Sequence, residues 1–171
     1  MKTIIIFQVL FIMLSSCYKE KEHDNTNPPT SDLKISLLQT FIDDSTITNI
    51  NGTWKVFSYE DYINDSVTLG SDVPHWLIPC NQEVVITFLD DSISGHNTSN
   101  EVFGNYVLQK RNIKVIGYGG TKVGQPIWGN MFEDVIYKID SFAINNLKLR
   151  FYYNNSKNSL TLEKSNPLIF I

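Results

Sequence analysis

The stretch "NLKLRFYYNNSKNSLTLEK", residues 146–164, decides the fold class of this chain. Side chains two residues apart lie on the same face of a β-strand, and residues 147–153 place apolar or aromatic side chains at every odd position. The polar residues Asn154–Asn158 then make a turn, after which Leu160 and Leu162 resume the alternation. The stretch therefore predicts a β-hairpin with one face toward a core and one toward water. The core face holds Leu147, Leu149, Phe151 and Tyr153, and the opposite face holds Lys148, Arg150 and Tyr152.

Similar patterns occur upstream, separated by polar turns. Residues 54–59 alternate in the same way, and "EVVITFLDD" (83–91) is a β-branched and aromatic run that ends in turn residues. "GNYVLQKRNIKVIGYGG" (104–120) predicts a second hairpin about Gln109–Asn112. Short strands that repeat between polar turns predict a mainly β fold, either a small antiparallel barrel or a sandwich.

One segment near residue 130 has the periodicity of a helix. Asn130 followed by Glu133 is similar to a capping box, which marks a helix start. Four apolar residues fall at i, i+3, i+4 and i+7, the spacing of one helix face. We expect one amphipathic helix that packs on the sheet or closes one mouth of a barrel. The four residues are Phe132, Val135, Ile136 and Ile139.

The N-terminal residues indicate export. Lys2 precedes the apolar run Ile4–Leu14, which is too short to span a membrane as a helix but has the length found in a secretory signal. The run ends in Leu14-Ser15-Ser16-Cys17, which resembles the lipobox of bacterial lipoproteins. That resemblance implies cleavage before Cys17, a diacylglyceryl thioether on its sulfur and acylation of the new amino terminus. Two or more acyl chains hold a protein firmly on a bilayer.

A disulfide with Cys80 is the alternative role for Cys17, since these are the two cysteines of the chain. A disulfide explains neither Leu14 nor the two small residues before Cys17, so we expect lipidation. Cys80 is then a small buried apolar side chain. Its immediate neighbours, Ile78–Asn81, offer no His or Lys to make the thiol reactive.

The residues after Cys17 have the composition of a linker. Residues 18–32 (YKEKEHDNTNPPTSD) contain one aromatic and no aliphatic side chain, so they cannot form a core. Their acidic, lysine-containing start resembles the surface-export signals of Bacteroidetes lipoproteins, and Tyr18 is not the aspartate that retains lipoproteins in the inner membrane of enterobacteria. We therefore expect lipid anchoring at the bacterial outer membrane, on its periplasmic or cell-surface face. The alternative for these residues is a tether that is solvated and carries no export signal.

The chain thus divides into four parts, and its charge excludes one class of partner. Net charge is −4 and the pI is near 5.3, without the clustered basic face that binds nucleic acid. Residues 33–49 allow either a helix or an adapter strand. The four parts are a lipoprotein signal peptide (1–16), a lipidated anchor and flexible linker (17–32), an adapter segment (33–49) and a β domain (50–171).

Six short motifs follow one another along the β region: Gly52–Trp54, Thr87–Phe88, Ser94–Asn97, Gly104–Tyr106, Gly119–Lys122 and Leu147–Tyr153. Their residue types, order and spacing resemble the META domain, or HslJ-like, family, and above all the META-like lipoproteins of Bacteroidetes. The resemblance implies a small lipocalin-topology β-barrel with one attached helix. It also implies a family without established catalytic residues, some of whose members are linked to stress response, antibiotic tolerance or virulence. The enterobacterial pattern has a cysteine in the first loop where this chain has His96, so any role of that cysteine is not transferred.

No motif in the sequence predicts a metal ion, a cofactor or catalysis. Residues 90–101 match some EF-hand positions, but serines replace charged ligands and a strand precedes them where an EF-hand needs a helix. His75, Cys80 and His96 match no zinc-ligand spacing. Gly-x-Ser-x-Gly and Ser-x-x-Lys elements are absent from the sequence. We therefore expect a protein that is not an enzyme.

Two tryptophans are the candidate ligand-contacting residues. Trp76 and Trp128 lie in or next to predicted loops, where the mouth of a barrel would be, and aromatic side chains there either close the core or stack on a ligand. Two functions remain open. The first is a non-catalytic interaction module for an envelope protein, possessing a barrel filled by its own side chains. The second is a carrier of an apolar or glycan ligand, which needs a cavity that opens near Trp76 or Trp128.

Overall fold

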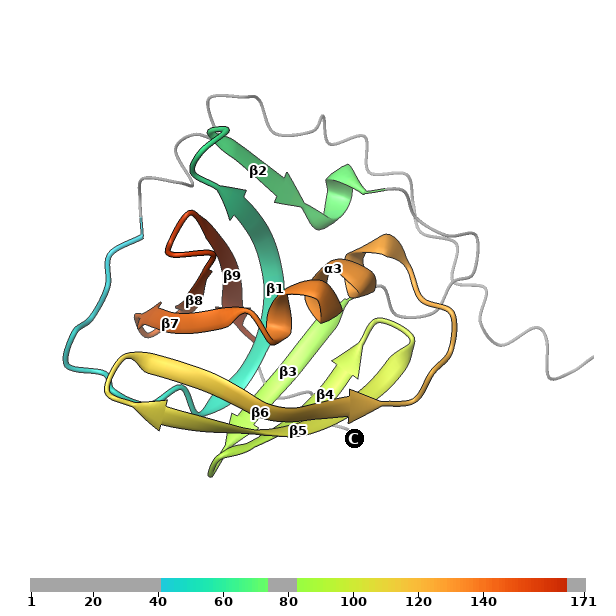
Figure 1. Ribbon diagram of the computed structural model, residues 1–171, viewed down its shortest axis with the longest axis horizontal. Helices are drawn as coiled ribbons and strands as arrows, with labels where there is room; N and C mark the ends of the chain where they lie inside the picture. The colour runs from blue at the N-terminus through green and yellow to red at the C-terminus, as the bar shows by residue number, and fades with distance from the viewer. Residues whose placement is uncertain (1–40, 74–82, 166–171) are drawn as a thin grey trace, which may run out of the picture.

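The computed structural model describes residues 41–73 and 83–165. Within these ranges the chain forms one antiparallel sheet of nine strands, one α-helix and a short 3-10 turn, Gly70–Asp72. The strands follow the order β2-β1-β3-β4-β5-β6-β7-β8-β9, and β1 also pairs with β9, so the sheet has a ring-like arrangement (Figure 1). The strands are β1 (Gly52–Asp61), β2 (Ser66–Leu69), β3 (Val84–Leu89), β4 (Ser92–Asn97), β5 (Asn100–Gln109), β6 (Asn112–Gly120), β7 (Ile139–Ile144), β8 (Lys148–Tyr153) and β9 (Asn158–Lys164).

The hairpin expected at residues 146–164 is confirmed as β8 and β9. Leu149 pairs with Leu162, and Phe151 pairs with Leu160, and all four side chains are fully buried. Leu147 departs from the expected face, because it precedes β8 and is exposed. The hairpin about Gln109–Asn112 is also confirmed, and it joins β5 to β6.

Side chains of the strands fill the interior of the ring. Phe88 is fully buried and packs edge-to-face on Phe151, with ring centroids 5.6 Å apart, and on Tyr106, with centroids 5.4 Å apart. Trp54 is also buried, and its indole Nε1 donates to the carbonyl oxygen of Ile50 at 2.9 Å. Edge-to-face aromatic packing adds to the free energy gained from burial alone.

A β-bulge in β1 changes which side chains point inward. The register with β9 shifts between Val56 and Ser58. Val56 faces the interior opposite Leu162, whereas beyond the bulge it is Tyr59 that faces inward, opposite Leu160. Glu60 therefore lies on the outer face of the sheet.

The helix forms, but its expected boundaries are wrong. Helix α3 spans Ile127–Ile136, with Pro126 at the N-cap and no side-chain cap, so Asn130 and Glu133 make no capping box. Proline suits a helix start because its fixed φ is already helical and it lacks an N–H. The expected stripe is buried, although its last member, Ile139, begins β7.

Two segments close the two ends of the ring. Helix α3 covers the end where β4 turns into β5, and in the segment before β1 Ile50 is part of the core and Ile47 packs against it. Residues 41–49 contain neither a helix nor a strand, so neither alternative for the adapter segment is seen in its described part; Leu33, Leu37 and Leu38, which suggested a helix, lie outside the described residues. They instead follow the outside of the ring from β7 to β1 (Figure 1).

The Asp90–Glu101 stretch is a hairpin and not a metal-binding loop. Asp90 and Asp91 both have positive φ, at 47° and 67°, and make the two-residue turn between β3 and β4. Gly95 also has positive φ, and a Cβ there would lie 2.1 Å from the carbonyl oxygen of Val85. Only glycine fits this close approach of β4 to β3.

Substitution of Phe88 tests the packed interior. We expect Phe88→Ala to lower the free energy of unfolding by about 3–5 kcal/mol, because it leaves a cavity between Phe151 and Tyr106. The control is Leu89→Ala at the next position, where the exposed side chain should contribute less than about 0.5 kcal/mol. Urea unfolding of both variants measures the difference, and equal losses would contradict a packed interior.

Candidate functional site

The outer face of the β5–β6 hairpin carries three exposed apolar side chains, which we call the β5–β6 patch: Phe103, Val107 and Ile116. Phe103 and Val107 both point outward from β5, and Ile116 is the extra residue at the bulge in β6 between them. The side chain of Phe103 is 66% exposed. Asn105, which is also exposed, lies between Phe103 and Val107 on the same face, so the three apolar side chains surround a polar one. Exposed apolar side chains grouped on one face are typical of interaction surfaces, whereas single ones need no explanation.

Small polar side chains line the outer face of the sheet beside the patch. Along one row, Thr53 pairs with Thr87, Thr87 with Ser94, and Ser94 with Phe103. The hydroxyls of Thr53 and Thr87 hydrogen-bond at 2.9 Å. On the other side, the ring of Phe103 lies over Gly119 of β6. An aromatic side chain is thus presented next to a row of hydroxyl groups.

A buried cluster of polar residues lies on the outer face where β1, β9 and β8 meet. The Glu60 carboxylate accepts hydrogen bonds at 2.5 Å from the hydroxyls of Ser58 and Ser159. Arg150 lies 4.0 Å from the same carboxylate and donates to the Thr161 hydroxyl at 3.0 Å. Glu60 is only 2% exposed and Arg150 only 5%, so sequence alternation alone misplaced Arg150 in solvent.

Burial dominates the electrostatics of this cluster. Loss of hydration raises the pKa of Glu60, and the hydrogen bonds from Ser159 and Ser58 and the charge of Arg150 oppose that rise. The ring of Phe41 stacks on the Arg150 guanidinium at 4.5 Å. Ser58 and Ser159 are buried as well, so the cluster is closed to solvent among the described residues. The cluster therefore joins strands.

A second polar network ties α3 to the β4–β5 turn. Asn100 is buried and uses its whole amide: it donates to the Val123 carbonyl and to the Gln125 side chain, and it accepts from Thr121 and the Val123 N–H. A Cβ on Gly129 would lie 2.6 Å from the Thr98 hydroxyl oxygen, so the helix packs directly on the turn. These contacts are long-range, and no local pattern in the sequence predicts them.

Two tyrosine hydroxyls lie buried beneath α3. Tyr59 packs edge-to-face on Trp128 with ring centroids 4.9 Å apart, and Tyr118 packs on Phe132 at 6.1 Å. Neither hydroxyl has a hydrogen-bond partner among the described residues. Loss of hydration raises the pKa of both tyrosines.

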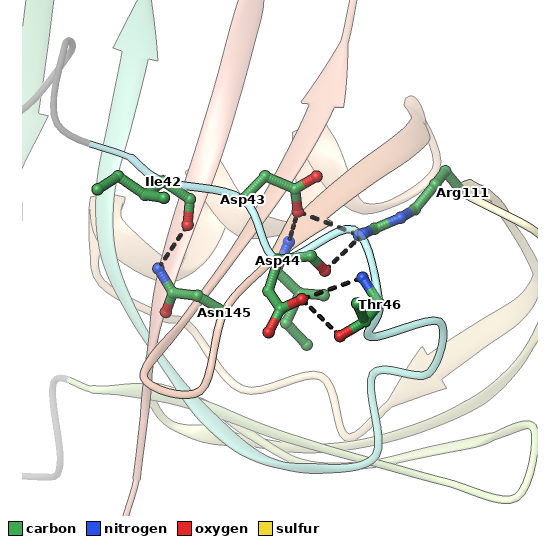
Figure 2. A network of polar contacts seen from close by, with 7 residues as sticks. Ile42, Asp43, Asp44, Thr46, Arg111 and Asn145 are labelled. Atoms are coloured by element: carbon green, nitrogen blue, oxygen red, sulfur yellow. Dashed lines mark hydrogen bonds and ion pairs between the residues drawn. The ribbon is translucent and has the colours of Figure 1, made fainter.

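A third network fastens residues 42–46 to the ends of β6 and β7 (Figure 2). Asp44 donates its N–H to the Ile144 carbonyl at 2.7 Å, and the Ile144 N–H donates to the Asp43 carboxylate at 2.8 Å. Arg111, in the β5–β6 turn, donates to the Asp44 carbonyl at 2.7 Å and forms an ion pair with Asp43 at 3.2 Å. The Thr46 hydroxyl and N–H donate to the Asp44 carboxylate and lower its pKa.

The structure places one of the two candidate tryptophans. Trp128 lies on α3 and is buried against Tyr59, so its ring is packed and not presented to solvent. Trp76, Cys17, His75 and Cys80 lie outside the described residues.

His96 lies on the outer face of β4, where burial lowers its pKa. Among residues 41–73 and 83–165, no group of three or more His, Cys, Asp or Glu side chains is placed to hold a metal ion.

Helix length bears on membrane insertion. Across the part of the chain that the structure describes, no helix combines the length and the apolarity needed to span a bilayer.

Comparison with known proteins finds solved structures with a similar fold. No family model matches the chain, and no curated protein matches it. The structure is similar to the NMR structure of a protein from Burkholderia xenovorans, with 17% identity and a TM-score of 0.51 over 87% of this chain and 97% of that one. A DUF4847-family protein from Bacteroides vulgatus aligns with 14% identity and a TM-score of 0.49 over 68% of this chain and 95% of that one. At 17% identity, the likeness to the Burkholderia protein concerns the fold alone.

Glu60 makes stability depend on pH. Its pKa in the folded protein lies above the ordinary value of 4.5. Its contribution to stability is therefore full below that ordinary pKa and is lost as pH rises through the folded pKa. We expect Glu60→Gln to remove this loss, and Glu60→Ala to lower the free energy of unfolding by about 3–5 kcal/mol, because Arg150 is left buried beside no carboxylate.

Urea unfolding between about pH 4 and pH 8 measures this dependence. The Asp140→Asn variant, at an exposed carboxylate on β7, is the control for loss of a negative charge. If Glu60→Gln retained the pH dependence of the unsubstituted chain, Glu60 would not be its source.

Proposed function

We propose that this chain is a lipid-anchored lipoprotein of the bacterial cell envelope, in which a META-like domain acts as a non-catalytic interaction module. The lipobox-like Leu14–Cys17 supports the anchor, and the ring-like antiparallel sheet with one helix is compatible with the lipocalin topology that the META resemblance implies. The outer membrane remains the expected location. Stress response is the physiological setting that the resemblance suggests.

One observation carries the interaction module: the interior is filled while apolar side chains are exposed outside. Phe88, Phe151 and Trp54 occupy the interior, whereas the β5–β6 patch lies on the surface beside a row of hydroxyl groups. Aromatic anchors surrounded by polar side chains are typical of protein-binding surfaces. A partner protein would therefore meet the outer face of β5 and β6.

The carrier of a small ligand is the second candidate, and one observation favours it. The hydroxyls of Tyr59 and Tyr118 are buried without partners among the described residues, and a ligand with hydrogen-bond acceptors would satisfy them. Native mass spectrometry of the protein purified from its cells reads out a retained ligand directly.

Anchoring is tested at Cys17. We expect the mature protein to fractionate with membranes and to carry a mass increase for a diacylglyceryl group and an acyl chain, and Cys17→Ala to abolish both, because thioether formation needs the sulfur. Cys80→Ala is the matched control and should leave both unchanged. Recovery of a Cys17–Cys80 disulfide in the unsubstituted protein would contradict the proposal.

The binding surface is tested by photocrosslinking in cells, using a photoreactive residue at Phe103. We expect a discrete crosslinked protein from position 103 and none from position 63, because Ile63 is equally exposed (65%) but lies in the β1–β2 turn, away from the patch. Equal labelling at both positions would mean nonspecific contact. Crosslinking from 63 alone would move the interface elsewhere.

A further inference from the structure

The pairing of β6 with β7, which we call the β6–β7 joint, is the shortest between neighbouring strands of the ring. These strands pair at a single register position, Asn112 with Ser141, whereas β5 and β6 pair along most of their length. One backbone hydrogen bond from Phe142 to the Arg111 carbonyl extends this joint. A sheet that closes on itself needs pairing at every joint, so something else must hold this one.

Residues 42–46 span this joint from outside. On the β7 side, Ile144 exchanges two hydrogen bonds with the segment, one with the Asp44 N–H and one with the Asp43 carboxylate, which takes the place of a strand carbonyl. Asn145 adds a hydrogen bond to the Ile42 carbonyl at 3.1 Å. On the other side, Arg111 binds both Asp43 and the Asp44 carbonyl.

Arg111 also contacts β7 directly. Its guanidinium lies 5.2 Å from the centre of the Phe142 ring, and Phe142 is buried in the core. The same side chain therefore reaches the segment and the strand beyond the joint. Figure 2 shows Asp43 and the Asp44 carbonyl converging on Arg111 while Asn145 approaches from the opposite side.

We infer that residues 42–46 form a clasp that holds the β6–β7 joint shut and that opens as a unit to expose the edge of β7. Release removes both hydrogen bonds of Ile144 and the ion pair of Arg111 together.

If the chain is anchored, as the proposed function holds, the position of the clasp in the sequence has a consequence for force on the anchor. Residues 42–46 lie in the adapter segment (33–49), which follows the linker from Cys17. Among the described residues, tension on the anchor would first meet Phe41, which stacks on Arg150, and then the clasp.

Hydrogen exchange on the full-length chain tests the clasp, with amide protection measured residue by residue. We expect Asp43→Ala to raise exchange at Ile144 and Phe142 by about tenfold, since a hydrogen bond to a charged group is lost. Asp43→Asn keeps an oxygen acceptor for the Ile144 N–H but loses the charge, so its effect should be smaller. Arg111→Met should also raise exchange at Phe142. In the double variant Asp43→Asn with Arg111→Met, the increase in exchange should be smaller than the sum of the two single increases, because the two residues are partners.

The control is Asp134→Ala, which removes an exposed carboxylate from α3 and not from the β6–β7 joint. Exchange within β3 and β4 should stay unchanged in every variant, which separates local opening from global unfolding. Unaltered protection at Ile144 in Asp43→Ala, or equal loss of protection throughout the sheet, would overturn the clasp. Exchange is measured in both the unsubstituted and the Cys17→Ala chains, and flotation on vesicles measures anchoring separately. Failure of the anchor can therefore be told apart from failure of the clasp.

Discussion

The pairing of β1 with β9 is the constraint on which the rest of this structure depends. β1 pairs with β3 through its first half and with β2 through its second, while β9 lies along its opposite edge. Most other strands pair with their neighbours in sequence, so this pairing supplies the long-range contact that turns an open sheet into a ring. The bulge between Val56 and Ser58 adjusts it, because Tyr59 then remains in the core while Glu60 lies outside.

The buried polar cluster gives that pairing its register. Ser58 and Glu60 come from β1, and Ser159 and Thr161 come from β9, directly opposite them. A shift of one residue in the β1–β9 register would point the Glu60 side chain into the apolar interior and leave Arg150 without its carboxylate. A buried unpaired charge is strongly destabilising. We therefore attribute to the cluster a role in specifying one register, while the aromatic core supplies most of the stabilising burial.

Features that depend on local periodicity were predictable from the sequence, and features that depend on distant contacts were not. The hairpins at 104–120 and 146–164 and the apolar stripe of α3 follow from spacing alone. The helix start was misplaced because the Asn130 amide binds Gln125 instead of capping a helix. Burial of Arg150 depends on Phe41 and Thr161, which alternation within one strand cannot reveal. The β5–β6 patch was missed as a group, since Ile116 joins Phe103 and Val107 only through a bulge.

The two ends of the β5–β6 hairpin connect the proposed surface to the rest of the molecule. Its turn carries Arg111, which binds the clasp, and its outer face carries the patch around Phe103. The patch and Arg111 therefore lie on one hairpin, and the contacts of Arg111 fasten the clasp to that hairpin. A partner bound at the patch would therefore be held by the same hairpin that fastens the segment following the linker.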